Sequence, residues 1–245
     1  MNQSLRMFIA LAIIAGIGLI LYRLLRFVQT KDQQQRAGLS SLAQRRGWRY
    51  EDAPSKLIDF RLSGTTNGVN WQVVGKREPG NEDSSPTTAW STNDIHYDDL
   101  VGLIRTRKGF EVMESTWARV ASGVLSALIS TVGLAQPQHS EVVKTGIRLK
   151  PGSPVIDQEF VAIVRPDRGL DRLLTPTLEQ ALQAWHDAKL IAAEKDSLSI
   201  DIGQTNLRVY CKWILAAEHM ERFIAVGLAT AVAVKGERRP AGPLL

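Results

Sequence analysis

"FRLSGTTNGVNWQVVGK", residues 60–76, carries the clearest structural signal in the chain. Asn67 and Gly68 fit the centre of a two-residue type I′ turn, because both central positions of that turn require a positive φ. After the turn, apolar and polar side chains alternate along residues 69–73 with the period of a strand that buries one face. The stretch therefore predicts a β-hairpin, and it makes an antiparallel sheet the expected architecture of the first half.

The segments on either side of this hairpin extend the prediction. AGLSSLAQRRGWRY, residues 37–50, predicts a short helix that Gly47 closes. The apolar face of that helix consists of Leu39, Leu42 and Ala43. Beyond the hairpin we expect a polar loop at 77–86 and two further strands at 87–95 and 99–107.

The C-terminal part predicts the order strand, helix, strand, strand, helix. The expected elements are a strand at 159–165, a helical stretch over 166–188, a strand pair at 197–203 and 206–214, and a helix over 215–234. The helical stretch begins at Pro166 and Asp167 and carries Trp185 on its apolar face. In the second strand of the pair, alternate side chains such as that of Cys211 point to the core. This order is typical of an α+β layer, in which two helices pack on one face of a small antiparallel sheet.

A segment in the middle of the chain interrupts this pattern. TWARVASGVLSALISTVGLAQPQ, residues 116–138, is uncharged after Arg119. Ser122, Ser126 and Ser130 recur at every fourth position, as on a helix with a stripe of small residues. Such stripes let helices approach closely, so we expect a helix buried in the domain or against a partner. A second membrane span is the alternative, and the serine and glycine content counts against it.

The chain begins with an apolar helical signal. Residues 7–22, MFIALAIIAGIGLILY, contain no charge, and as a helix they are about 24 Å long at 1.5 Å per residue. Flanking leucines extend this length toward the hydrocarbon core of a bilayer, and Arg6 and Arg23 fall near its two interfaces. A cleaved signal peptide is the rival interpretation, but the stretch ends without a small-residue cleavage site. We therefore expect a transmembrane anchor at residues 1–28.

The residues after the anchor predict its orientation. More Lys and Arg follow the apolar stretch than precede it, and the more basic side tends to stay in the cytoplasm. We expect a single-pass protein of the inner (plasma) membrane with a cytoplasmic C-terminal domain. The lone Cys211 agrees, because one cysteine forms no internal disulfide. The Gln-rich residues 29–36 either continue the anchor helix or act as a polar tether. The expected remainder is a soluble α+β domain at 37–236, as one unit or as subdomains 37–150 and 151–236, and a flexible tail at 237–245.

The charge of the chain is concentrated near the N-terminus. Residues 1–36 contain five Lys and Arg against one Asp, a net charge of +4, whereas the rest contains 25 Lys and Arg against 24 Asp and Glu, a net charge of +1. A nucleic-acid-binding protein needs a basic surface that displaces counterions from phosphates. The folded part has no such excess in its composition, so we expect no nucleic-acid partner and assign the N-terminal basicity to the lipid bilayer.

The sequence contains no recognised catalytic motif. G-x-S-x-G, Walker, C-x-x-C and H-E-x-x-H patterns are all missing from it. The best metal candidate is NDIHYDD, residues 93–99, in which His96, Asp94, Asp98 and Asp99 lie close together, although acidic residues between strands usually form a solvated turn. His186 beside Asp187, and His219 between glutamates, fit surface histidines better than catalytic pairs. We assign no catalytic, cofactor-binding or metal-binding residue and expect no cofactor.

Several phrases resemble those of uncharacterised bacterial single-pass membrane-anchored proteins with an α+β soluble domain. The matching phrases are RRGWRYE at 45–51, GTTNGVNW at 64–71 and EFVAIVRPDRGLDRLLTPTLEQAL at 159–182, and the last corresponds to the family's LLTP-x-L pattern. The resemblance touches most of the soluble part and departs from the family at 116–138. It implies a shared fold and a membrane address, and no activity.

These observations favour a membrane-tethered interaction or assembly module. Its partner would be another membrane protein or a second copy of the chain, contacted through residues 116–138. A ligand-sensing domain is the first alternative, and a membrane-bound hydrolase or metal enzyme that uses residues 93–99 is the second. Whether the chain is an enzyme stays open, with the missing motifs favouring a negative answer.

Overall fold

A computed structural model of the chain describes residues 3–55, 57–76, 87–94, 101–112, 147–149, 154–165, 173–188, 190, 196–212, 214 and 216–235. The helices are α1 (Gln3–Arg46), α5 (Pro154–Glu159), α7 (Pro176–His186) and α9 (Ala217–Lys235). The strands are β1 (Arg49–Ser55), β2 (Ile58–Thr66), β3 (Val69–Lys76), β4 (Thr87–Thr92), β5 (Val101–Thr106), β6 (Ile147–Leu149), β7 (Phe160–Arg165), β8 (Ser199–Ile202) and β9 (Leu207–Lys212).

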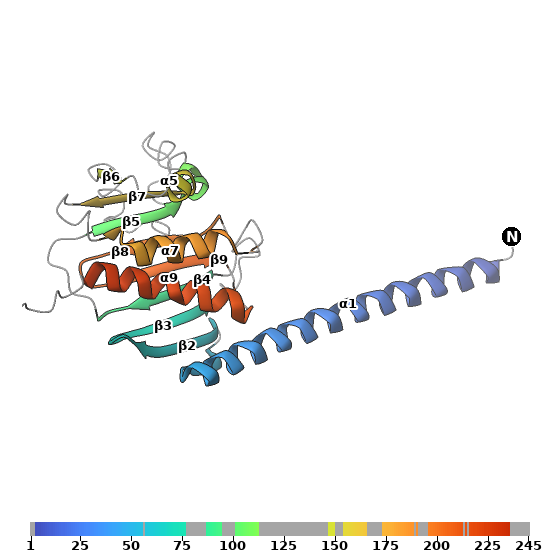
Figure 1. The fold of residues 1–245 in the computed structure, drawn as a ribbon. Coiled ribbons are helices and arrows are strands. Elements are labelled where there is room, and N and C mark those ends of the chain that lie inside the picture. Colours follow the sequence, from blue (N-terminus) through green and yellow to red (C-terminus); the bar gives the residue numbers. More distant parts are fainter. Residues whose placement is uncertain are drawn as a thin grey trace, which may run out of the picture.

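All these strands belong to one antiparallel sheet with the order β1-β2-β3-β4-β9-β8-β5-β7-β6 (Figure 1). The α+β class and the antiparallel sheet are confirmed. The C-terminal strands do not form the small sheet that we predicted, because β9 pairs with β4, and β5 lies between β8 and β7. Residues 37–150 and 151–236 therefore contribute to the same sheet.

The hairpin that predicted the sheet forms as expected. Asn67 and Gly68 have φ values of 52° and 71°, as the type I′ turn requires. Buried and exposed side chains alternate along β3 from Val69 to Val73. The alternation in β9 is also confirmed, since Cys211 is buried and Lys212 is exposed.

Two helices, α7 and α9, cover one face of the sheet (Figure 1). The hydroxyl of Thr175 caps α7 by accepting a hydrogen bond from the backbone N–H of Leu178 at 3.3 Å, and Pro176 follows the cap. The predicted start of this helical stretch, at residues 166–172, lies outside the described residues. Trp185 on α7 and Phe223 on α9 are fully buried, with their ring centroids 5.9 Å apart. The main hydrophobic core thus lies between the two helices and the sheet.

Helix α1 has 44 residues, which corresponds to a length of about 66 Å at 1.5 Å per residue. It continues without a break through residues 29–36 and through the short helix predicted near residue 40, so the Gln-rich segment is helical. Its N-terminal part projects away from the sheet, and its C-terminal end lies against the body (Figure 1). Gly47, with a φ of 69°, ends the helix as predicted.

The docked end of α1 carries both apolar and polar contacts. Leu39, Leu42 and Ala43 belong to the main core. Arg36 donates to a carboxylate oxygen of Asp52 at 2.5 Å, and the hydroxyl of Tyr50 donates to the same carboxylate at 3.2 Å. Burial and the neighbouring Asp52 raise the pKa of Tyr50 to about 12.

Within the part of the chain that the structure describes, no helix is long and apolar enough to cross a bilayer. Most side chains of the predicted anchor, residues 1–28, lie outside that part. The predicted loop at 77–86, the segment 116–138 and the tail at 237–245 also lie outside it. The expectations for these four segments therefore stay predictions.

Candidate functional site

The metal candidate at 93–99 is described only at Asn93 and Asp94. A carboxylate oxygen of Asp94 accepts a hydrogen bond from the backbone N–H of Asn70 at 2.7 Å, next to the β2–β3 turn. No group of three or more His, Cys, Asp or Glu among the described residues could hold a metal ion. His96, Asp98 and Asp99 lie outside these residues.

Of the histidines in the two predicted surface pairs, His186 is paired with a residue other than its neighbour in the sequence. Nδ1 of His186 lies 3.6 Å from a carboxylate oxygen of Glu159, whereas Asp187 accepts hydrogen bonds from the side-chain amide of Gln183 at 2.9 Å. His219 is half-buried at the start of α9. Both glutamates near it are engaged by arginines, Glu218 by Arg222 and Glu221 by Arg46.

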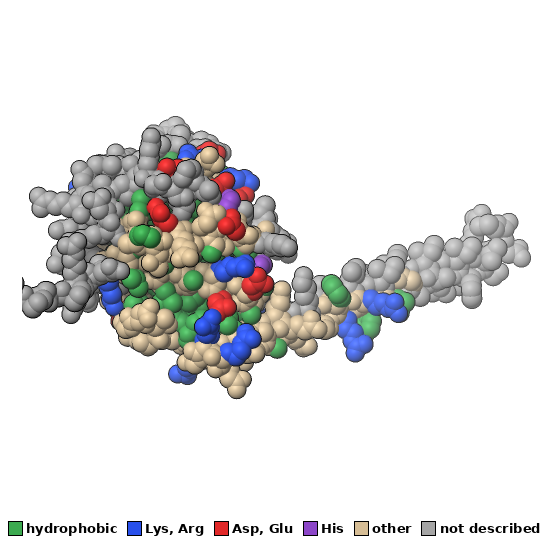
Figure 2. Space-filling view, viewed as in Figure 1, with side chains coloured by type: hydrophobic (Ala, Val, Ile, Leu, Met, Phe, Trp, Pro, Cys, Tyr) green, Lys and Arg blue, Asp and Glu red, His purple; other side chains and the backbone are tan. Residues whose placement is uncertain are grey.

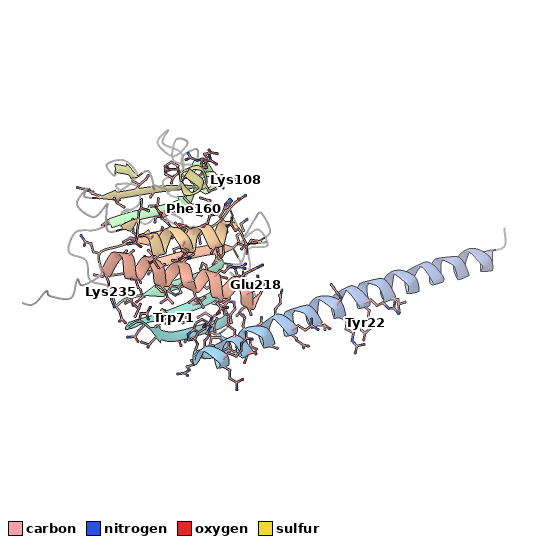
Figure 3. The ribbon with its side chains drawn as sticks, viewed as in Figure 1. Tyr22, Trp71, Lys108, Phe160, Glu218 and Lys235 are labelled. Carbon is pink, nitrogen blue, oxygen red and sulfur yellow. The ribbon has the colours of Figure 1, made fainter. Side chains whose placement is uncertain are left out.

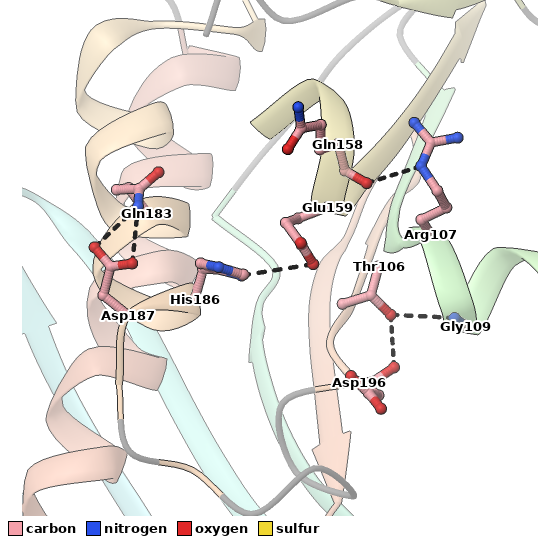
Figure 4. Close-up of polar contacts among 9 residues, drawn as sticks. All are labelled: Thr106, Arg107, Gly109, Gln158, Glu159, Gln183, His186, Asp187 and Asp196. Carbon is pink, nitrogen blue, oxygen red and sulfur yellow. Dashed lines mark hydrogen bonds and ion pairs between the residues drawn. The ribbon is translucent and has the colours of Figure 1, made fainter. Parts of the chain in front are cut away.

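A small pocket lies where the end of β5, the start of β7 and the end of α7 come near one another (Figure 4). It is lined by Thr106, Lys108, Glu159, Phe160, Trp185, His186 and Asp196. Its volume is about 30 Å³. A cavity needs roughly 10–15 Å³ per water molecule, so this pocket has room for about two waters.

Hydrogen bonds from separate segments hold one wall of the pocket (Figure 4). The Thr106 hydroxyl donates to the backbone carbonyl of Asp196 at 2.6 Å and accepts from the backbone N–H of Gly109 at 3.2 Å. Lys108 donates to the carboxylate of Asp196 at 2.6 Å. This hydrogen bond and the charge of Asp196 raise the pKa of Lys108. The wall therefore joins the end of β5 to the chain that leads into β8.

The chemical capacity of the pocket is small. Glu159 and His186 form a carboxylate–imidazole pair, and the buried Nε1–H of Trp185 has no hydrogen-bond partner among the described residues. The hydroxyl of Thr106 in the lining already donates to a backbone carbonyl. Pockets that bind metabolites usually have volumes of 300–1,000 Å³, about ten times larger or more. The arrangement is suited to holding water within a structural junction.

We expect the Thr106→Val substitution to lower the free energy of unfolding by about 2 kcal/mol, because it leaves a part-buried carbonyl and a part-buried backbone N–H without their partner. Urea unfolding of the full chain in detergent measures this loss. Thr87→Val, at an exposed position of β4, is the matched control and should change stability by less than about 0.5 kcal/mol. Equal effects of the two substitutions would show that the junction contributes nothing.

A second polar cluster lies on the sheet face opposite α7 and α9. Its members are Arg105 on β5, Ser199 and Asp201 on β8, and Arg208 and Tyr210 on β9. The alternation predicted for the strand at 206–214 implies that Arg208 and Tyr210 lie on this face, but the sequence analysis did not single out Arg105, Ser199 or Asp201. Arg105 could have been found from the sequence, because it is a charged residue that directly follows the apolar run of a buried strand. The pocket residues come from distant segments, and no local pattern connects them.

Comparison of the chain with protein-family models, with curated proteins and with solved structures finds no match. The resemblance to membrane-anchored bacterial proteins therefore stays a prediction, and the functional argument rests on the geometry of this chain.

Proposed function

We propose that this protein is a membrane-tethered interaction module, whose α+β body is held at a set distance from the inner membrane by α1. The continuity of α1 from its projecting end into the hydrophobic core is the observation that carries this proposal. A continuous helix holds distance and direction, whereas a Gly-rich or Ser-rich linker behaves as a random coil.

The projecting part of α1 has the features of a membrane-inserted end. The uncharged stretch at residues 7–22 is followed by a band of exposed aromatic and basic side chains (Figures 2 and 3). Tyr22 and Phe27 are 58% and 69% exposed, and Arg23 and Arg26 are also exposed. Tyrosine and arginine are favoured at the boundary between lipid and water. The band thus supports an interface near residues 22–27.

The length of α1 between its exposed aromatic and basic band and its buried end gives the distance between the membrane surface and the body. Leu39, the first fully buried residue among the described side chains of α1, follows Phe27 by twelve positions, which corresponds to about 18 Å of helix. The body would therefore sit just clear of the lipid headgroups. The basic residues after the apolar stretch favour the cytoplasmic side for this body.

The interior of the body supports interaction over ligand sensing or catalysis. The pocket beside His186 holds about two waters by volume, and its polar groups join segments of the fold to one another. A tether raises the local concentration of the body near other proteins of the same membrane, or near a second copy of the chain. The uncharged segment 116–138 is our candidate for the contact.

The Ile14→Arg substitution tests the tether. A charge in the middle of an anchor costs about 2.5–3.5 kcal/mol for insertion, so we expect the variant to leave the membrane fraction on alkaline washing, while the unaltered chain stays. Gln33→Arg, at an exposed position of α1 outside the anchor, is the control and should stay with the membrane. Release of the unaltered chain by the same wash would end the proposal. A reporter fused to the C-terminus reads the side on which the body lies.

The interaction itself is tested by cross-linking in whole cells through a photoreactive residue at the exposed position of Gln34. We expect discrete cross-linked products from the anchored chain and their loss in the Ile14→Arg variant, because release lowers the local concentration. An anchored chain that gives no product from Gln34 or from a second photoreactive residue within 116–138 would contradict the interaction role while leaving the tether intact.

A further inference from the structure

The sheet face opposite α7 and α9 differs from the core face in chemistry. Strand register places Arg105 on β5 opposite Ser199 on β8, and Ser199 opposite Tyr210 on β9. In the next row, Asp201 on β8 pairs with Arg208 on β9. Side chains at directly paired positions lie about 5 Å apart at their Cβ atoms, so these five groups share one small area in the middle of the sheet.

Arg105 is the unusual member of this cluster. Its side chain is half-buried, and burial lowers the pKa of its guanidinium, an effect that Asp201 and Tyr210 only partly oppose. Among the described residues its buried Nε–H has no hydrogen-bond acceptor, although the carboxylate of Asp201 is near enough to act on its charge. A buried donor of this kind costs about 1–3 kcal/mol, and more when it belongs to a charged group.

The groups around Arg105 comprise the carboxylate of Asp201 and several hydroxyl and guanidinium donors. The hydroxyl of Tyr210 accepts a long hydrogen bond from Nη1 of Arg208 at 3.4 Å, which leaves its own O–H to donate elsewhere. The hydroxyl of Ser199 donates to the carboxylate of Asp201 at 3.2 Å. The guanidinium of Arg105 and the hydroxyl of Tyr210 therefore face the same area with hydrogen atoms to offer, and Arg208 adds positive charge behind the tyrosine.

We propose that Arg105 and Tyr210, supported by Arg208, bind an oxyanion, a carboxylate or phosphate group, on the face of the sheet opposite α7 and α9. A guanidinium presents its N–H groups as a planar fork that matches such an anion, and a charged acceptor compensates for the burial of the cation better than a water molecule does. The approach lies over β4 and β9, where Ala89 and Arg208 are half-buried and Lys212 is exposed. This site goes beyond the tether and does not depend on it.

The test uses the full chain in zwitterionic detergent, with inorganic phosphate and acetate as separate probes. The ¹⁵Nε–H resonances of the arginines are followed by NMR. The Arg105 resonance is assigned as the one that is missing from the spectrum of the Arg105→Lys variant. We expect a saturable shift of the Arg105 signal with at least one probe. We also expect binding about tenfold weaker in Arg105→Lys, because lysine keeps the charge but loses the fork. Tighter binding of phosphate assigns a phosphorylated ligand, and tighter binding of acetate assigns a carboxylate ligand.

Arg61→Lys is the matched control. Arg61 lies on the same face, and its buried Nε also has no partner among the described residues, but its Nη1 lies 3.2 Å from a carboxylate oxygen of Glu51. We expect this variant to bind the probe as the unaltered chain does. If Arg105→Lys does not fold, Tyr210→Phe replaces it, with binding about threefold weaker because one neutral donor is lost. An Arg105 signal that neither probe shifts, or that shifts without saturation and in step with Arg61, overturns the site.

Discussion

The Gly227→Ala substitution should lower the free energy of unfolding by about 2 kcal/mol, although alanine is the better helix former by about 1 kcal/mol. Gly227 lies in the middle of α9, where the helix crosses the fully buried indole of Trp90 on β4. A Cβ atom on Gly227 would lie 2.3 Å from Cδ2 of that ring. The ring has little room to move, because Val73 and Val209 flank it on the neighbouring strands. The helix would have to lift from the sheet.

Two further variants separate the effect of this close contact on the free energy of unfolding from the effect of helix propensity. Gly38→Ala, in α1, adds a Cβ whose nearest neighbour is the Cβ of Ala217 at 3.8 Å, an ordinary contact, so it should raise stability by up to about 1 kcal/mol. In a Trp90→Phe background, the cost of Gly227→Ala should fall by about 1 kcal/mol or more, because a smaller ring leaves space. Urea unfolding of the four variants gives these values. A stabilising Gly227→Ala in the unaltered background would contradict the packing of α9 on Trp90.

Local elements of this fold could be predicted because their signals are contained in a few residues. The positive φ angles at Asn67 and Gly68 follow from the residue types that tolerate them, and the buried residues of β9 follow from simple alternation. The inward face of α7 was predicted for the same reason. The order of the strands was not, because the pairing of β4 with β9 joins residues more than a hundred positions apart. No short window of sequence contains that information.

The residues of the candidate sites were likewise predicted where the signal is local and missed where it depends on long-range contacts. Cys211 was placed correctly in the core from the pattern of one strand. The pocket beside His186 was missed, because Glu159 and Asp196 are brought to it by β7 and by the approach to β8. The small net charge of the folded part gave no sign of the polar cluster around Arg105. A net charge does not show how charges are distributed over the two faces of a sheet. Arg105 was visible in the sequence as a charged residue beside an apolar run, but the burial of its Nε–H without an acceptor among the described residues depends on tertiary structure.

The Leu39→Ala substitution should lower the free energy of unfolding by about 3 kcal/mol, because it removes a fully buried side chain from the main core and leaves a cavity. Gln44→Ala, at an exposed position near the same end of α1, is the control, with an expected change of less than about 0.5 kcal/mol. Urea unfolding of the full chain in detergent, followed by tryptophan fluorescence, measures both. An unchanged free energy of unfolding in the Leu39→Ala variant would mean that the end of α1 contacts the body without stabilising its core.

The size of this effect bears on the tether as well as on stability. If Leu39 stabilises the core to this extent, α1 cannot swing away from the body without losing a large share of a total stability that is typically only 5–15 kcal/mol. The ion pairs of Arg36 with Asp52 and of Arg46 with Glu221 then restrict rotation about the helix axis. The direction in which α1 leaves the body would be fixed by folding. A membrane-inserted α1 would then present the same side of the sheet to its surroundings in every copy, which is the property that a module acting beside other membrane proteins requires.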